Sequence, residues 1–389
     1  MRVVLVNNFF YPRVGGSSTV VEQLAESLSS KGHSVLVVTG QYLGSETFES
    51  RNGYDIYRLP TWILPESKFT LNFDINFALK FGNYRKLTDA INNFNPDVIH
   101  CHGQFLDLTW KALKFARRNK VPSILTLHTR LVNPGIVLNS LLYLLDQIVV
   151  RLILKIWPPD RFIIIDKTFR SYAKSRYRVR EDSMLFIPVG VDVSRFSKKR
   201  TQARDKEQSK VILSIGHVIP VRNRLAIVRA LPRILEIYPN TKLRILGNVY
   251  QDGFMRLAKK LKVDHAIEAP GAVASAEIPN ELSRAALEIH DIQGYGISIA
   301  SLEAMASGVT CVMATDLDYF PHAPMIPGFH FIHVSSENSH EIADAVIQTF
   351  DNSENSNRIA KQGSEYVRKN FNIADIVNSH LLAYRALKD

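Results

Sequence analysis

Short apolar runs alternate with amphipathic helical patterns along the chain, and this alternation constrains the fold more than any single motif. Val3–Val6 is an uninterrupted apolar run, typical of a strand buried on both faces of a parallel sheet. A helical pattern at Thr19–Ser30 and a second strand at Ser34–Thr39 follow it. Because parallel strands are joined by crossover helices, we expect doubly wound α/β structure.

A polar stretch interrupts the alternation. Ser197–Lys210 is highly charged and typical of a linker, and a strand pattern restarts at Val211–Ile215. Each series approaches about 200 residues, an ordinary size for one domain. The sequence therefore predicts two doubly wound domains that face a cleft.

The composition is that of a globular protein, with 46% hydrophobic and 22% charged residues among 389. Cys101 and Cys311 both lie in apolar, strand-like surroundings. Their placement argues against a disulfide framework or a cysteine metal site, and it suits a reducing cytoplasm. Met1–Asn8 is expected to be a first strand, since it is too short and too polar to be a signal peptide.

Positive charge is concentrated in the first half of the chain. Residues 1–200 hold 28 Lys and Arg against 16 Asp and Glu, a net charge of +12, whereas the remainder has a net charge of −1. Two interpretations stay open: a solvated surface, or an anionic partner such as a phospholipid surface or a phosphate-bearing substrate. The basic, tyrosine-rich stretch Lys167–Arg180 matches no nucleic-acid module, so nucleic acid is not an expected partner.

Two apolar segments each allow two interpretations. Leu131–Trp157 is expected to be a buried helix pair, with peripheral membrane contact as the alternative, because its charges leave no spanning stretch of about 20 residues. Phenylalanines recur at steps of four within residues 61–86, so a helix would carry them as one stripe. That stripe is expected to pack into the core, the alternative being an interfacial helix or an acceptor-binding edge; it comprises Phe69, Phe73, Phe77 and Phe81.

The stretch Gly294–Gly308 has the features of a phosphate-binding turn and helix. Ser298 is placed to cap the helix, which leaves backbone N–H groups and the positive dipole end pointing into the glycine turn. Glycines allow a phosphate to approach that end closely. Glu303 lies barely more than a turn further on, within reach of a sugar hydroxyl attached to such a phosphate. This stretch therefore predicts a nucleoside-diphosphate site.

His102 and His128 follow two successive predicted strands, Val98–Gly103 and Ser123–Leu127. Ligands of parallel sheets bind beyond the carboxyl ends of strands, where both histidines are expected. A lone histidine is more often a hydrogen-bonded structural residue, but two at neighbouring strand ends favour a site.

Motifs in this order and spacing resemble the family-four glycosyltransferases over nearly the whole chain. The resemblance lies in Pro12 with Gly15-Gly16, Gly32–Val35, Pro96–His102, Ile187–Asp192, Gly216–Arg222, Gly247 and Glu303–Gly308. It implies the GT-B fold, with two Rossmann-like domains: an acceptor-binding domain at 1–195 and a nucleotide-sugar-binding domain at 196–372. It also implies that the final helix, about 373–389, packs back on the first domain, that the anomeric configuration is retained, and that no metal or other cofactor is required.

The resemblance also implies roles for particular residues. His128 would orient a hydroxyl of the transferred sugar, Glu303 would bind both ribose hydroxyls, and Arg222 would clamp the diphosphate. Developing charge on a leaving diphosphate needs such fixed partners. The remaining donor-binding positions are Gly15, Gly16, His217, Gly247, Tyr295, Gly296, Ile297, Ser298 and Ile299.

The chain departs from the family pattern at three places. His217 replaces the phosphate-binding arginine, so a permanent charge becomes a titratable one. Arg222-Asn223 replaces a lysine-glycine pair. The first of two glutamates spaced eight residues apart is Tyr295, or Gln293 if the glycines are matched instead. Because that glutamate contacts the donor sugar, the departure leaves donor identity and full activity open. Asp316-Leu317-Asp318 lies in a loop and is not expected to bind a metal.

The expected function is therefore that of a retaining transferase, either cytoplasmic or peripheral on the cytoplasmic face of the membrane. It would move a hexose from a nucleotide-sugar to a membrane-associated lipid or polysaccharide-precursor acceptor. A soluble acceptor and a catalytically silent, transferase-like subunit are the alternatives. A nicotinamide dehydrogenase is disfavoured, since the chain lacks the spaced G-x-G-x-x-G fingerprint.

Overall fold

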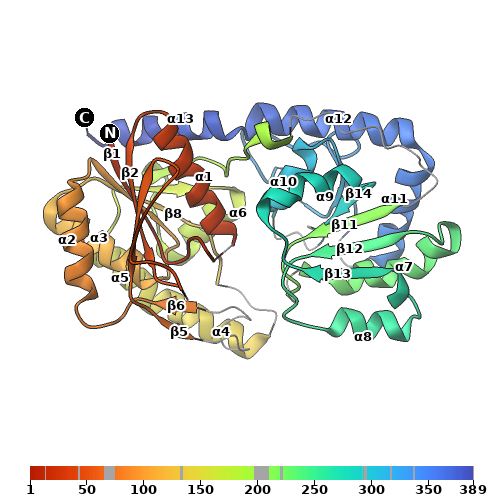
Figure 1. Cartoon of the computed structure of the whole chain (residues 1–389), viewed down its shortest axis with the longest axis horizontal. Coiled ribbons are helices and arrows are strands. Elements are labelled where there is room, and N and C mark those ends of the chain that lie inside the picture. The colour runs from red at the N-terminus through yellow and green to blue at the C-terminus, as the bar shows by residue number, and fades with distance from the viewer. Residues whose placement is uncertain are drawn as a thin grey trace. The chain divides into compact units, whose positions relative to one another are not determined.

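The structure is a computed structural model, and its contacts divide the chain into two compact units (Figure 1). Unit 1 comprises Met1–Gly190 together with Ile373–Asp389, and unit 2 comprises Val191–Asn372. The described residues are 1–13, 15–42, 44–64, 75–131, 135–196, 210–219, 222–290, 292, 296–315, 318–335 and 338–388. Most of the predicted linker, residues 197–209, lies outside them.

Unit 1 is built on an eight-stranded sheet in which every strand pairing is parallel except that of β3 with β4. The strand order is β10-β9-β8-β7-β1-β2-β4-β3, so the chain winds outward from β1 in both directions. The order reverses between β1 and β7, and ligands of doubly wound sheets bind at such a point. The strands are β1 (Arg2–Asn7), β2 (Ser34–Gly40), β3 (Phe48–Arg51), β4 (Tyr54–Leu59), β7 (Val98–His102), β8 (Ser123–Thr126), β9 (Arg161–Ile164) and β10 (Met184–Phe186).

Helices cover both faces of this sheet. Val4 and Val6 of β1 point into one apolar core and Val3 and Leu5 into the other, as the alternation of side chains along a strand requires. The helices are α1 (Gly16–Ser30), α2 (Asn83–Phe94), α3 (Asp107–Asn119), α4 (Ile136–Leu145), α5 (Arg151–Ile156), α6 (Lys167–Tyr172) and α13 (Ile373–Arg385). Single π-helical turns η2 (Asp146–Val150) and η3 (Ala173–Tyr177) follow α4 and α6, and a 3₁₀ turn η4 (Glu181–Ser183) precedes β10.

The C-terminal helix α13 is part of unit 1. Its residues Val377 and Tyr384 are fully buried in the same core as Val3 and Leu5 of β1. It lies beside α1 on one face of the sheet (Figure 1). The chain therefore returns to unit 1 after it has completed unit 2.

Unit 2 is a second doubly wound domain, with a six-stranded parallel sheet in the order β13-β12-β11-β14-β15-β16. Here the winding direction reverses between β11 and β14. The strands are β11 (Val211–Ile215), β12 (Lys242–Leu246), β13 (Ile267–Gly271), β14 (Leu287–Ile289), β15 (Thr310–Met313) and β16 (Ile332–His333). The helices are α7 (Arg224–Ile237), α8 (Gly253–Lys260), α9 (Ile278–Arg284), α10 (Ile299–Ala306), α11 (Ser339–Asp351) and α12 (Ser353–Asn370), with 3₁₀ turns at Val193–Phe196, Asp264–Ala266 and Ser275–Glu277. The α/β, two-domain prediction is confirmed.

The predicted phenylalanine helix is wrong where the structure describes it. Phe77 lies in a short strand, β6 (Ile75–Phe77), which pairs with β5 (Trp62–Leu64). The buried Asn76 donates from Nδ2 to the carbonyl of Asn8 at 2.9 Å, a tertiary contact that overrides the helical spacing. Phe81 is fully exposed rather than packed in the core. Phe69 and Phe73 lie outside the described residues.

The prediction of a buried helix pair at Leu131–Trp157 is also wrong. From Ile136 to Ile156 the chain is one helical run of 21 residues, made of α4, η2 and α5. By length and composition the run is long and apolar enough to cross a membrane. Only 17% of its most apolar stretch of 18 residues is buried in the structure. We call this run the apolar helix.

Candidate functional site

Two glycines let three loops of unit 2 meet at the reversal between β11 and β14. Gly216 follows β11 with φ +142°, and a Cβ there would lie 2.3 Å from the Cε1 atom of His290, which follows β14. Gly247 follows β12 with φ +143°, and a Cβ there would lie 2.5 Å from the carbonyl carbon of Gly216. Both positions therefore require glycine, for backbone conformation and for space.

The hydrogen bonds of His217 define its tautomer. Its Nδ1 accepts the backbone N–H of Asn248 at 3.1 Å, so a neutral ring carries its proton on Nε2. The ring packs edge-on against Tyr250, with 5.4 Å between ring centroids. His217 is half-buried and follows β11, at the position where the family pattern has an arginine.

The start of α7 contains a second arginine that the sequence analysis missed. Asn223 adopts the left-handed conformation, with φ 40°, and its side chain caps the helix by accepting from the N–H of Ala226 at 3.3 Å. Asparagine tolerates this conformation, which explains how it can replace the expected glycine. Arg224, not Arg222, is the buried arginine; it donates to the carbonyl of Gly216 at 3.2 Å and lies 2.8 Å from His290 Nδ1. No sequence signal separated the two arginines, because the family motif points to position 222.

Burial and these two arginines keep His290 neutral. Burial, and then the charges of Arg222 and Arg224, hold the pKa of His290 well below its ordinary value. A neutral His290 accepts from Arg224 at Nδ1, so the two side chains join the loops after β11 and β14. Arg222 is half-buried beside this pair.

The predicted helix after the glycine turn is present as α10. Ser298 caps it, accepting from the N–H of Ser301 at 3.2 Å, and Gly308 follows its end with φ +72°. Gly296 has φ +122°, and a Cβ there would lie 2.0 Å from the hydroxyl of Tyr319, so any other residue would strain the backbone and displace Tyr319. Ile297 is buried, and Ile299 begins the helix.

Glu303 is a buried carboxyl group with a cationic neighbour. The residue is 8% exposed, and Arg195 Nη1 lies 3.5 Å from its Oε1. Burial raises the pKa of Glu303 to about 7; Arg195 opposes this shift and Asp192 reinforces it. Arg195 also donates to Ser275 Oγ at 3.1 Å, which holds the guanidinium in place. Arg195 was not predicted from the sequence; it follows the Ile187–Asp192 motif by three residues.

In unit 1, Gly15 and Gly16 form an open helix N-terminus. Gly15 is the extended residue before α1, and no side chain caps the helix. A Cβ at Gly15 would meet nothing closer than 3.7 Å, and one at Gly16 would meet nothing within 4 Å. Packing within the described residues therefore does not explain either glycine, and α1 presents accessible N–H groups to an anion.

The strand-end histidines belong to a cluster of four. His102 Nδ1 lies 2.9 Å from His128 Nε2, with the two rings stacked at a 22° angle. His100 lies beneath them, bonded to Tyr384 Oη and Thr126 Oγ1, each at 2.7 Å. Burial lowers the pKa of His128 to about 4 and that of His380, on α13, to about 3.

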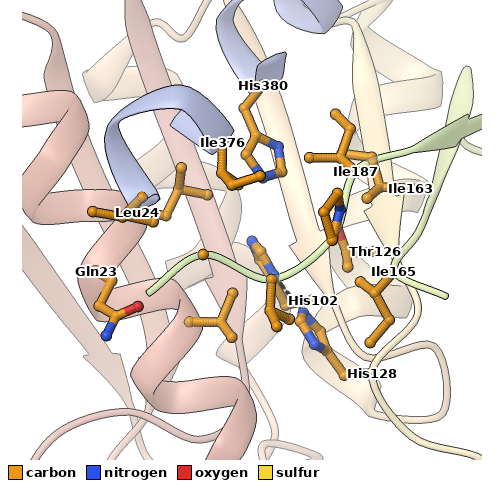
Figure 2. A pocket seen from close by; sticks show the side chains of 15 residues that line it. Gln23, Leu24, His102, Thr126, His128, Ile163, Ile165, Ile187, Ile376 and His380 are labelled. Atoms are coloured by element: carbon orange, nitrogen blue, oxygen red, sulfur yellow. Dashed lines mark hydrogen bonds between the residues drawn. The ribbon is translucent and has the colours of Figure 1, made fainter. Parts of the chain in front are cut away.

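A small pocket opens beside these rings (Figure 2). His102, Thr126 and His128 line it from the ends of β7 and β8, and Gln23 and His380 line it from α1 and α13. Within the described part of the chain, His102 Nε2 and His380 Nδ1 are buried and have no hydrogen-bond partner. Apolar side chains complete the lining, among them Leu24, Ile163, Ile187 and Ile376, so the pocket beside His128 combines a few neutral polar atoms with an apolar wall.

The remaining predicted site features fall as follows. Tyr295 lies outside the described residues, as do Gln293, Gly294, Asp316 and Leu317. Among the residues that the structure describes, no group of three or more His, Cys, Asp or Glu could hold a metal ion. Cys101 and Cys311 are buried free thiols.

Two doubly wound domains, each with its loop cluster at the point where strand order reverses, form the architecture of GT-B glycosyltransferases. Sequence models confirm this class: that of Glycosyltransferase Family 4 matches residues 14–195, and that of Glycosyl transferases group 1 matches residues 195–366. The chain belongs to glycosyltransferase family 4.

Several characterised proteins are similar to the chain. Alpha-monoglucosyldiacylglycerol synthase of Streptococcus pneumoniae is 22% identical over 335 residues, which cover 80% of this chain and 70% of that protein. Phosphatidyl-myo-inositol mannosyltransferase of Mycobacterium tuberculosis is 26% identical over 339 residues, which cover 82% of this chain and 79% of that protein. The structure of Anabaena Alr3699/HepE in complex with UDP has a TM-score of 0.71 at 14% identity, covering 99% of this chain and 100% of that one.

Proposed function

We propose that this chain is a retaining hexosyltransferase that acts on a lipid or lipid-linked polysaccharide precursor at the cytoplasmic face of a membrane, with a nucleoside-diphosphate sugar as donor and no metal ion. The family assignment supports glycosyl transfer. Two relatives bear the names of enzymes that glycosylate lipids, and a protein of the same fold binds UDP.

The observation that carries the proposal is the environment of Glu303. Arg195 is the only partner described for this carboxylate, at 3.5 Å, and burial raises the pKa of Glu303 to about 7. A carboxylate left so poorly satisfied in a folded interior is typical of a binding site. It can accept two hydroxyl hydrogen bonds at once, which is what the vicinal hydroxyls of a ribose offer.

Other groups of unit 2 suit a leaving diphosphate. Arg222 supplies a permanent positive charge, and the Nε2–H of His217 supplies a donor. The N-terminus of α10 adds backbone N–H groups and its dipole. In the proposed reaction the bond from the anomeric carbon to the phosphate oxygen breaks, and the acceptor hydroxyl bonds to the same face of that carbon. The hydroxyl proton passes to the departing phosphate oxygen, so charge develops where these donors can stabilise it.

His128 is proposed to act on the sugar as a neutral ring. With a pKa of about 4 it is uncharged near neutral pH, so it orients a hydroxyl by hydrogen bonding and adds no charge of its own. A neutral partner does not repel the oxocarbenium-like centre that forms as the diphosphate departs.

Incubation with a panel of nucleotide-sugars and membrane lipids tests the proposal. We expect one donor to transfer its sugar, with Glu303→Gln weakening nucleotide binding and the exposed control Glu354→Gln leaving it unchanged. Failure to bind any nucleoside diphosphate would refute the proposal. Nucleotide binding without transfer to any acceptor would instead identify a catalytically silent subunit.

A further inference from the structure

The apolar helix has one face bound to unit 1. Leu142, Asp146, Val150 and Leu154 are buried at regular steps of four residues. This row packs the helix onto the domain, and it is the row that an amphipathic surface helix is expected to bury.

The opposite face is apolar as well. A row of large aliphatic side chains, each more than half exposed, follows the outward side: Val137, Leu141, Leu144, Ile148, Leu152 and Ile156. A helix exposed to water normally carries polar residues on its outward face. Single exposed apolar residues are ordinary, but a contiguous row marks a surface that contacts something apolar.

Buried polar contacts hold the apolar helix on unit 1. The carboxylate of Asp146 accepts from the hydroxyls of Tyr172 and Tyr177, and Gln147 Nε2 donates to the carbonyl of Arg176 at 2.9 Å. A spanning orientation would break these contacts or carry them into hydrocarbon, where an unsatisfied carboxyl is costly. The helix is therefore suited to lie on a membrane rather than to cross it.

Basic residues flank the same surface. Arg151 and Lys155 lie on the apolar helix itself, and η3 packs against η2 and α5. Residues 167–180, which include η3, hold six Lys and Arg (Lys167, Arg170, Lys174, Arg176, Arg178, Arg180) and no Asp or Glu. Glu181 pairs with Arg170 and Lys174, and Asp182 pairs with Arg180, so half of these cations are paired with a carboxylate. The Arg176 guanidinium stacks 4.0 Å from the ring centroid of Tyr143, which brings a cation to the edge of the apolar helix. Apolar side chains bordered by cations match the interface of an anionic bilayer.

We propose that the apolar helix, with Arg151, Lys155 and the adjacent basic segment, docks unit 1 in the interfacial region of an anionic phospholipid bilayer, lying in the membrane plane. This inference deepens the proposed function, since it assigns the surface that would bring unit 1 to a lipid acceptor. It concerns binding alone and is tested without sugar transfer.

Co-sedimentation with lipid vesicles measures this binding. One set of vesicles is phosphatidylcholine alone, and the other contains about one phosphatidylglycerol in three lipids, which gives the surface a negative potential. We expect the full chain to bind the anionic vesicles, less strongly as salt rises, and to bind the neutral ones weakly. The variant Leu144→Gln/Ile148→Gln/Leu152→Gln keeps helix-forming residues and is expected to lose at least about tenfold in affinity.

A matched control removes equally exposed apolar residues from unit 2. Ile237 and Ile326 are 53% and 52% exposed, close to Leu144 and Leu152, and Ile237→Gln/Ile326→Gln is expected to bind vesicles like the parent. Equal vesicle binding by the triple variant would overturn the proposal. So would resistance to alkaline carbonate extraction, which indicates a spanning helix, or self-association without vesicles that the triple variant abolishes. If vesicles bind but no nucleotide does, the proposed function fails and the docking surface stands.

Discussion

The Nδ1 atom of His102 lies 2.9 Å from the Nε2 atom of His128, at the ends of two adjacent strands. Both rings are neutral, since burial holds the pKa of each below its ordinary value. One ring must donate to the other, so His102 selects the nitrogen of His128 that carries the proton. His128 then meets a sugar hydroxyl with one defined donor or acceptor.

Replacing His102 should therefore impair transfer without weakening nucleotide binding. For His102→Phe we expect kcat to fall about tenfold, the scale of one hydrogen bond, with the donor KM unchanged. His102→Gln, which keeps a polar partner for His128, should recover part of the loss. Steady-state kinetics at several pH values measure both; an equal loss in the two variants would mean that His102 only supports the fold.

Nucleotide affinity should depend on pH through Glu303. Its pKa of about 7 means that the carboxyl group ionises as pH rises through neutrality, and only the ionised form offers both oxygens as strong, charged acceptors to two vicinal hydroxyls. We expect calorimetric affinity for the nucleoside diphosphate to rise between pH 6 and pH 8. The rise should be absent in Glu303→Gln, and a parallel rise in that variant would assign the titration to another group.

The same shift has an opposite effect on stability. A carboxyl whose pKa is raised on folding stabilises the fold below its unfolded pKa of about 4.5 and loses that contribution as pH rises through 7. Glu303→Gln should therefore increase the free energy of unfolding at pH 8 by about 1–3 kcal/mol, less whatever the Arg195 pair contributes. Denaturant titration at pH 5 and pH 8 measures the difference; no gain at pH 8 would contradict it.

Local patterns predicted the elements that the site depends on. An uninterrupted apolar run such as Val3–Val6 is typical of a central strand of a parallel sheet, which is buried on both faces. Ser298 and Gly308 mark the two ends of α10, because capping depends on residues that are close in sequence. Tertiary contacts were not predictable in this way. Arg195 meets Glu303 across more than 100 residues, and nothing in the spacing indicated that Arg224 rather than Arg222 would be buried.

The exposure of the apolar helix could not be predicted from the sequence for a different reason. Its composition is apolar on all sides, and periodicity cannot distinguish a helix buried in a core from one whose second face is open. The buried row ending at Leu154 is defined by Asp146 and its tyrosine partners, which come from a separate segment of the chain. The phenylalanine spacing failed for a related reason, since Asn76 bonds to Asn8, 68 residues earlier.

Unit 1 should lose stability in mild acid because of its buried histidines. A histidine whose pKa is lowered on folding stabilises the fold above its unfolded pKa of about 6.5, and loses that contribution as pH falls through the folded value, about 4 for His128 and about 3 for His380. His380→Leu should flatten the decrease in Tm between pH 6.5 and pH 4. An unchanged slope would show that the other histidines or the carboxyl groups account for it.

A substitution at Gly16 should separate an effect on donor binding from an effect on folding stability. A methyl group at Gly16 would meet no atom within 4 Å, so Gly16→Ala should leave Tm unchanged or slightly raised, as expected at a helix start. The same methyl group would occupy the space through which an anion approaches the N-terminus of α1, so donor affinity should fall about tenfold or more. Gly253 is a matched control, since it also begins a helix and has no atom within 4 Å of its Cβ position. Gly253→Ala should change neither property; if Gly16→Ala binds the donor like Gly253→Ala, the first turn of α1 takes no part in donor binding.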